Sequence, residues 1–163
     1  MRQITVAALA SACCLALPAS ALSASNLDRG YLYAAADAGF LFAQGGGAKT
    51  FDIGLGLRNR HYGIEAGYVG VFANSSTLSG GYVDAYGYLP LGRRVSLFAT
   101  GGAAYVNSSY APAFGYIRNQ LGVRAGAGAE WRLSDNWTLR TAIRYQSAIT
   151  SAAAVTAGII VHI

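Results

Sequence analysis

The fold is decided by the stretch NQLGVRAGAGAEWRLSDNWTLRTAIRYQ, which spans residues 119–146. In its first half every second residue from Leu121 to Trp131 is apolar, and glycine or a charged residue lies between them. A polar turn at residues 134–136 follows, and the second half repeats the alternation. Because successive side chains of a β-strand point to opposite faces, this stretch predicts a hairpin with one apolar face and one charged face.

The length of the hairpin favours a membrane over a soluble sheet. Each limb has about a dozen residues, whereas a tilted strand crosses a bilayer with ~9 to 11. Strands of soluble proteins more often have ~5 to 6 residues. We therefore expect a transmembrane hairpin. The alternative is a soluble sheet whose charged face contacts water.

The composition fits one narrow barrel. The chain has 163 residues, of which 12% are charged, 53% are hydrophobic and 21 are glycine. That length indicates a single domain, and abundant glycine and alanine suit strands that approach one another closely. The net charge is +5, of which Arg2 at the N-terminal leader contributes one. The arginines behind the remaining +4 are scattered singly along the strands and not clustered, so nucleic-acid binding is not predicted.

The N-terminus has the pattern of a secretory signal peptide at residues 1–24, which leaves residues 25–163 as the barrel domain. Arg2 precedes an apolar run at residues 4–17, and small residues then offer cleavage after Ala21 or Ala24. A lipobox-like sequence ending in Cys13 is the alternative, with a lipidated mature N-terminus. Both cysteines lie inside this leader, so no disulfide is expected in the mature chain.

Eight segments after residue 30 alternate as strands do, and together they predict an all-β, eight-stranded antiparallel up-and-down transmembrane β-barrel. We expect loops at residues 45–47, 74–81 and 107–118, and short turns at residues 59–60, 90–94 and 134–136. Short turns belong on the periplasmic side of such barrels, which would place both termini in the periplasm. A membrane helix over residues 145–163 is the alternative, since those 19 residues contain no Lys, Arg, Asp or Glu. The strands are expected at residues 31–42, 50–58, 62–72, 82–89, 95–106, 121–132, 137–146 and 153–163.

Alternation assigns five acids and five arginines to the charged face. An eight-stranded barrel is just wide enough for side chains to fill it, and unpaired charge inside would cost several kcal/mol per ion. Arginine and carboxylate groups satisfy one another in such a space, so a plugged interior without an open channel is expected. The predicted network is Asp37, Asp52, Arg58, Glu65, Asp84, Arg124, Glu130, Arg132, Arg140 and Arg144.

The apolar face carries aromatic residues toward the strand ends, where interfacial belts form in membrane barrels. The C-terminal strand resembles the signal that the outer-membrane barrel assembly machinery recognises, with aliphatic residues where that signal has aromatic ones. The expected interfacial aromatics are Tyr68, Tyr105, Trp131, Trp137 and Tyr145. The expected assembly signal is Thr156, Gly158, Val161 and Ile163.

Three phrases resemble the OmpA-like transmembrane β-barrel family of Gram-negative outer membranes: residues 62–71 (YGIEAGYVGV), 87–105 (GYLPLGRRVSLFATGGAAY) and 131–146 (WRLSDNWTLRTAIRYQ). The resemblance implies an interior ionic network in which Glu65 and Arg140 are the best positional matches. It also implies contact with outer-membrane lipid and lipopolysaccharide, and with the assembly machinery and periplasmic chaperones. The peptidoglycan-binding domain of larger members is not expected.

These expectations favour a non-enzymatic outer-membrane barrel that supports envelope integrity or presents surface loops. An adhesin that binds an extracellular partner through loop 107–118 is the first alternative. A lipid-modifying enzyme is less favoured, because the histidine bases are limited to His61 in a turn and His162 at the penultimate position. A small porin conflicts with the filled lumen, and no catalytic residue, metal site or cofactor motif is predicted.

Overall fold

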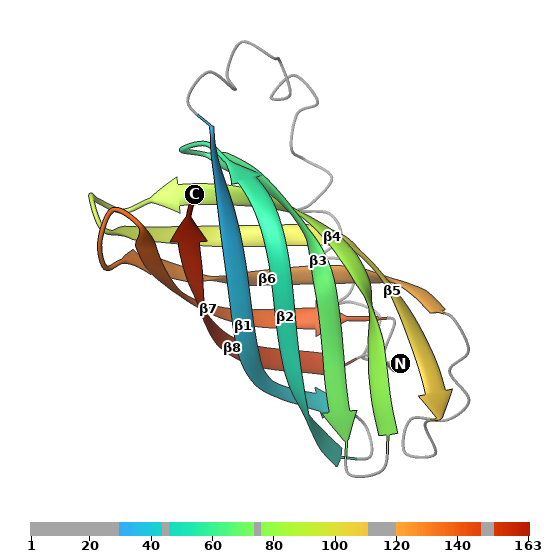
Figure 1. Ribbon diagram of the computed structural model, residues 1–163. Coiled ribbons are helices and arrows are strands. Elements are labelled where there is room, and N and C mark those ends of the chain that lie inside the picture. The colour runs from blue at the N-terminus through green and yellow to red at the C-terminus, as the bar shows by residue number, and fades with distance from the viewer. Residues whose placement is uncertain (1–29, 44–45, 74–75, 111–119, 148–151) are drawn as a thin grey trace, which may run out of the picture.

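The computed structural model describes residues 30–43, 46–73, 76–110, 120–147 and 152–163. All regular structure in these residues is β, arranged as one closed barrel in which each strand is antiparallel to both neighbours. Figure 1 shows the tilted strands, with the start of β1 and the C-terminus at the same end. The eight strands are β1 (Tyr31–Ala43), β2 (Gly46–Arg58), β3 (Tyr62–Ala73), β4 (Ser76–Pro90), β5 (Val95–Tyr110), β6 (Gln120–Arg132), β7 (Trp137–Gln146) and β8 (Ala152–His162).

The barrel closes because β8 pairs with β1 as well as with β7. Tyr33 lies opposite His162 in the first ladder, and Trp137 lies opposite Val161 in the second. The fold class predicted from the sequence is therefore confirmed, and the alternative of a helix at residues 145–163 is wrong. No helix in the described part of the chain has the length and apolar character that a membrane span requires.

The barrel is apolar outside and charged inside, as alternation predicts. Leu55 is 59% exposed and Ile143 is 64% exposed on the outer face, whereas Glu65 and Arg140 are fully buried in the lumen. An apolar surface that surrounds the whole molecule is far larger than the patches that soluble monomers expose. This outer face is therefore suited to contact with lipid tails rather than with water.

The lumen is divided into layers, a feature that the sequence pattern did not reveal. At the end where β1 joins β2, most inward residues are apolar and form one cluster that includes Leu41, Val69 and Leu78. The charged residues lie next to this cluster, and Tyr86, Tyr88 and Phe98 form an aromatic cluster toward the other end. We call the first end the loop end and the second, which holds the connections at 59–61, 91–94 and 133–136, the turn end.

The strands are longer at the loop end than the sequence suggested. β2 begins at Gly46 and β4 at Ser76, so the expected loops at residues 45–47 and 74–81 are corrected to connections at residues 44–45 and 74–75. β5 continues to Tyr110, into the expected loop 107–118. Glycine and serine are common in loops, but here the backbones of Gly46 and Gly47 pair with β1 and that of Ser76 pairs with β3. Residues 77–81 pair with both β3 and β5. The expected alternation of short and long connections therefore fails at two of the hairpins.

Close approach between strands explains why some of the glycines are needed. A Cβ atom on Gly80 would lie 1.9 Å from the carbonyl oxygen of Tyr105 on β5. A Cβ atom on the adjacent Gly81 would lie 3.7 Å from its nearest neighbour, the carbonyl oxygen of Gly67. The inward position thus allows no side chain, whereas the outward position does.

We expect Gly80→Ala to lower the free energy of unfolding by about 1–3 kcal/mol, because the strands must move apart to fit the methyl group. Gly81→Ala is the matched control and should leave stability unchanged. Urea unfolding in detergent, followed by tryptophan fluorescence, measures both. Equal stability of the two variants would contradict this account of the β4–β5 contact.

Candidate functional site

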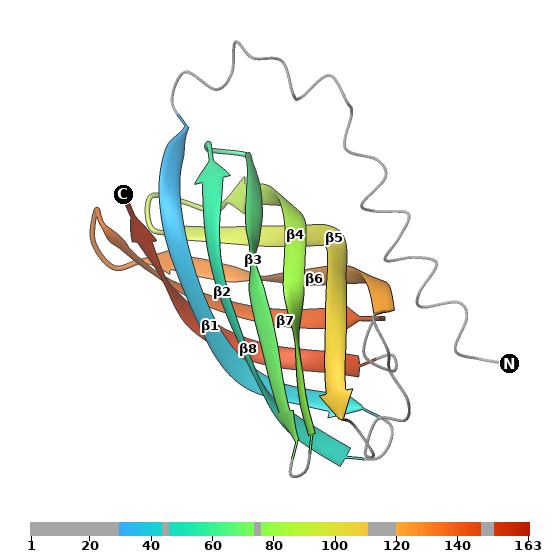
Figure 2. The ribbon, with the colours of Figure 1, turned by 45° about the vertical axis from the view of Figure 1, so that its right-hand side comes forward.

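The buried charges are segregated between opposite walls of the lumen. The acids Asp37, Asp52, Glu65 and Asp84 lie on β1, β2, β3 and β4, and three arginines lie on β6 and β7. Figure 2 shows β1–β4 and β6–β8 on opposite sides of the barrel. In register, Asp37 lies directly opposite Asp52, and Glu65 directly opposite Asp84. Like charges placed this way repel one another, so each acidic pair needs cations from across the lumen.

Arg140 on β7 is the centre of the network and is fully buried. Its Nη1 donates to Oε2 of Glu65 at 3.0 Å and to Oδ2 of Asp37 at 3.4 Å, and its Nε donates to Oε1 of Glu130 at 3.3 Å. One guanidinium thereby joins acids from β1, β3 and β6. Such a planar fork can serve several carboxylates at once, which an ammonium point charge does less well.

Arg144 and Arg124 neutralise the remaining acids. Arg144 bridges the repelling pair on β1 and β2, with Nη2 at 2.8 Å from Oδ2 of Asp37 and Nη1 bonded to Asp52. Arg124 donates from Nη2 to Oδ2 of Asp52 at 2.8 Å, and its Nε lies 3.3 Å from Oδ2 of Asp84. The acids of the β1–β4 wall are thus all linked to the arginines of the other wall.

Arg58 and Glu130 form a pair of reversed polarity near the turn end. The arginine is on β2 and the acid on β6, and the two side chains are bonded to each other. The guanidinium of Arg58 also lies 3.7 Å from the centroid of the Tyr88 ring, which is within cation–π range. Glu130 therefore connects this pair to Arg140 and extends the network toward the turn end.

Tyrosine hydroxyls complete the site, and the sequence-based prediction of the network omitted them. Tyr33 donates to Oε2 of Glu65 at 2.9 Å, Tyr82 donates to Oε1 at 2.8 Å, and Tyr86 approaches the same Oε1 at 3.3 Å. Alternation in the sequence places Tyr82 and Tyr86 on the same face of the strand as Asp84, so the sequence pattern already indicated that both tyrosines point inward. The Glu65 carboxylate is thus held by phenols from two strands as well as by Arg140.

The structure brings nine of the ten predicted network residues into ion pairs, and Arg132 is the exception. Alternation along β6 assigns Arg132 to the inward face, since it lies opposite the buried Thr138. It is nevertheless exposed, because it is the last residue of β6 and extends past the packed layer into the open end of the barrel. Its assignment to the interior network is therefore wrong.

Arg132 instead lines a basic mouth at the turn end. This cavity of about 610 Å³ is lined by Arg58, Arg60, Arg93, Arg94 and Arg132, together with His61, Glu130 and several uncharged residues. Its acid, Glu130, is already bonded to Arg58 and Arg140. The other four guanidiniums form no ion pair with the described acids, so the mouth carries net positive charge.

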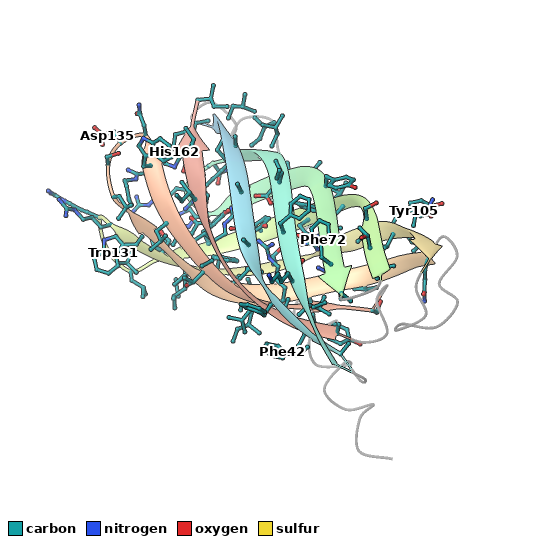
Figure 3. All side chains as sticks on the ribbon, turned by 60° about the horizontal axis from the view of Figure 1, so that its bottom comes forward. Phe42, Phe72, Tyr105, Trp131, Asp135 and His162 are labelled. Carbon is teal, nitrogen blue, oxygen red and sulfur yellow. The ribbon has the colours of Figure 1, made fainter. Side chains whose placement is uncertain are left out.

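The expected interfacial aromatics lie on the outer face. Tyr68 is 47% exposed near the middle of β3, and Tyr105 is 48% exposed toward the loop end. Trp131 and Trp137 are 56% and 48% exposed on either side of the β6–β7 turn. Tyr145 is half-buried. Figure 3 shows Trp131 near Asp135 and His162 at one end, and Phe42 and Tyr105 toward the other. Their interfacial role stays a prediction.

The residues of the expected assembly signal have structural contacts of their own. Thr156 points inward and is buried, whereas Ile163 is 71% exposed. A Cβ atom on Gly158 would lie 2.0 Å from Oδ1 of Asp37, so glycine at this position makes room for the network. Recognition of these residues, and of Val161, by the assembly machinery stays a prediction.

His162 connects the C-terminal strand to the β6–β7 turn and to β7 through polar contacts of its ring. Its Nε2 lies 3.2 Å from Oγ1 of Thr138 and its Nδ1 lies 3.0 Å from the backbone oxygen of Asp135. A threonine beside a histidine is the beginning of a nucleophile–base arrangement, but the Thr138 side chain is buried and presents little surface to a substrate. Within the described residues, no group of three or more His, Cys, Asp or Glu side chains could hold a metal ion.

The leader at residues 1–24, with Cys13, lies outside the described residues, as do residues 111–118 of the expected binding loop. Both assignments therefore stay predictions.

Removal of the central cation tests the network. We expect Arg140→Met to lower the free energy of unfolding by about 3–5 kcal/mol, because it leaves buried carboxylates without their shared partner. The double variant Arg140→Met/Glu65→Gln should be more stable than the sum of the single changes predicts, since it also removes one orphaned charge. Arg132→Gln is the control and should change stability by less than about 0.5 kcal/mol. Urea titration in detergent measures all three, and an unaffected Arg140→Met barrel would contradict the network.

Comparison with known proteins places this geometry in a family. A family model described as the outer membrane protein beta-barrel domain matches residues 5–159. No curated protein sequence matches significantly. Among solved structures, a de novo designed transmembrane β-barrel superposes with a TM-score of 0.63 at 18% identity and covers 82% of this chain and 95% of its own.

Two natural barrels are also similar in fold. Neisserial surface protein A superposes with a TM-score of 0.63 at 15% identity, over 82% of this chain and 97% of that one. Ail, the attachment invasion locus protein of Yersinia pestis, gives a TM-score of 0.55 at 16% identity, over 82% and 96%. Together with the closed eight-stranded barrel and its apolar outer wall, the family match shows that this chain belongs to the outer membrane protein β-barrel domain family, as a small OmpA-like barrel of the outer membrane.

Proposed function

We propose that this protein is a closed, non-enzymatic barrel that supports the integrity of the outer membrane. In this proposal residues 1–24 are a cleaved signal peptide, the turn end and both termini face the periplasm, and the loop end faces the outside. The longest connection between strands, residues 111–119, supports this orientation because outer-membrane barrels carry their longer loops on the extracellular side. The observation that carries the proposal is the filled lumen.

Two seals of different chemistry lie in series along the barrel axis. The cluster at the loop end contains Leu41 and Leu78, both fully buried, and most of its side chains are apolar. The ionic network beside it fills the lumen with paired side chains, of which Arg140 and Glu65 have no exposed surface. Water or solute would have to pass both layers, so a static barrel of this kind does not conduct.

The chemistry of the lumen supports a structural role over catalysis. A hydrolase needs a nucleophile and a base that a substrate can reach, whereas the acids and arginines of the network are bonded to one another. His61 is exposed in a turn, and the His162 ring is bonded to Thr138 and to a backbone oxygen. Thr138 lines the basic mouth but is buried, so these groups support the fold and offer little surface to a substrate.

Planar-bilayer recording tests the two seals. We expect no large stable conductance from the unaltered protein, because each layer blocks the lumen independently. A conducting lumen should require side chains of both layers to be truncated, as in the fourfold variant Leu41→Ala/Leu78→Ala/Glu65→Ala/Arg140→Ala. The double variant of either layer alone should conduct far less. Heat-modifiable migration in electrophoresis verifies that each variant is folded. A large stable pore in the unaltered protein would refute the proposal.

A second candidate function is adhesion, and the length of the β5–β6 connection favours it. Residues 111–119 (APAFGYIRN) contain two aromatic residues and one arginine, which are common in binding surfaces. Loops on a rigid scaffold often carry recognition. One structural relative is named as an attachment invasion locus protein, although the identity of 16% supports likeness of fold alone.

Replacement of residues 111–119 by a glycine–serine linker of equal length tests adhesion. If these residues bind a host surface, cells that express the variant should lose attachment while the barrel remains folded and present in the outer membrane. Phe114→Ser/Tyr116→Ser should produce most of the loss, because aromatic residues dominate binding surfaces. Undiminished attachment of the linker variant would exclude an adhesin that acts through this connection.

A further inference from the structure

Two hollows meet at the turn end of β3, β4 and β5, and they share His61 and Tyr62. One is the basic mouth described above. The other is a groove of about 450 Å³ on the barrel wall. It is lined by His61, Tyr62, Gly87, Tyr88, Leu89, Leu97, Phe98 and Ala99. A single ligand can therefore occupy an apolar and a cationic environment at once.

The groove is shaped by small residues between larger ones. Tyr62, Gly87 and Ala99 lie side by side in register on the three strands, and Leu89 lies opposite Leu97 in the row nearer the turn. Because Gly87 has no side chain, the floor of the groove is recessed there, and the side chains of Tyr62, Leu89 and Leu97 form its walls. Leu89 is 61% exposed and Leu97 41% exposed on the face that meets lipid. An apolar hollow on this face fits a hydrocarbon chain.

The mouth that adjoins the groove is cationic, and no acid among the described residues forms an ion pair with its arginines other than Arg58. Arg60 follows β2, Arg93 and Arg94 lie in the turn that follows β4, and all three line the mouth that shares His61 and Tyr62 with the groove. All three are exposed. The nearby Glu130 is already bonded to Arg58 and Arg140. Guanidinium groups at this level favour phosphate, which they bind with paired hydrogen bonds.

We propose that the groove and the adjoining arginines bind one anionic phospholipid of the periplasmic leaflet. An acyl chain lies in the groove between Tyr62 and Leu97, and the phosphate contacts Arg60, Arg93 and Arg94. The proposal rests on the proposed orientation, in which the turn end faces the periplasm, where the leaflet consists of phospholipid. It is independent of whether the lumen conducts or the loop end binds a partner.

Lipid that remains bound after extraction tests the proposal. The protein is reconstituted in nanodiscs of equal parts phosphatidylglycerol and phosphatidylcholine and extracted into mild detergent, and the bound lipid is counted by native mass spectrometry. We expect one phosphatidylglycerol per barrel. Arg60→Gln/Arg93→Gln/Arg94→Gln should reduce its enrichment over phosphatidylcholine by roughly an order of magnitude or more. The variant with lysine at these three positions keeps the charge and should retain most of the enrichment.

The groove is tested by a matched pair of substitutions on β5. Ala99→Leu fills the floor and should abolish retention of the lipid, whereas Ala103→Leu, on the same face nearer the loop end, should leave it unchanged. Loss of enrichment in the arginine variant but not in Ala99→Leu would show general electrostatic attraction and overturn the seated lipid. Unchanged enrichment in every variant would overturn the whole proposal.

A separate experiment tests the orientation of the barrel in the membrane, so that a wrong orientation can be distinguished from a failure to bind lipid. Gly92→Cys places a thiol in the β4–β5 turn, where a Cβ atom meets nothing within 4 Å. A membrane-impermeant maleimide should leave this cysteine unlabelled in intact cells and label it after the outer membrane is permeabilised. Labelling in intact cells would refute the assignment to the periplasmic leaflet, even if nanodiscs retain the lipid.

Discussion

The structure depends on ion pairs that cross the lumen. Acids on β1–β4 repel one another in register, and the arginines of β6 and β7 reach them only when the sheet has closed. Arg140 and Glu65 come from strands far apart in the chain, and neither side chain retains contact with water. Because a buried unpaired charge costs several kcal/mol, an open sheet or a slipped register would be heavily penalised. Closure and charge pairing therefore stabilise each other.

The same network makes the lumen a core instead of a channel. In a soluble protein the apolar side chains would fill the interior, whereas here most of them face outward and polar groups must complete the inside. The tyrosines around Glu65 and the apolar cluster near Leu41 fill the space that the salt bridges leave. The result is a cylinder whose interior is filled by paired charges and packed side chains.

Those two ends differ in character. The loop end is closed by an apolar cluster, and the turn end opens into a basic cavity. The arginines of the turn end lie beside exposed tryptophan and leucine side chains, a combination that suits the level of the lipid headgroups. An outer membrane is itself asymmetric, so a barrel with different ends can be matched to both of its leaflets.

The sequence by itself determined the class of structure, because a period of two residues is a local property. Alternation assigned Glu65 and Arg140 to the inside and Trp131 to the outside, and strand length indicated a membrane. Only the tertiary structure decided which acid meets which arginine, since those distances are set by register and closure across the lumen. It also decided that Arg132 lies beyond the packed layer, and that Ser76 belongs to a strand, because depth in the barrel and pairing with neighbours are not encoded in alternation.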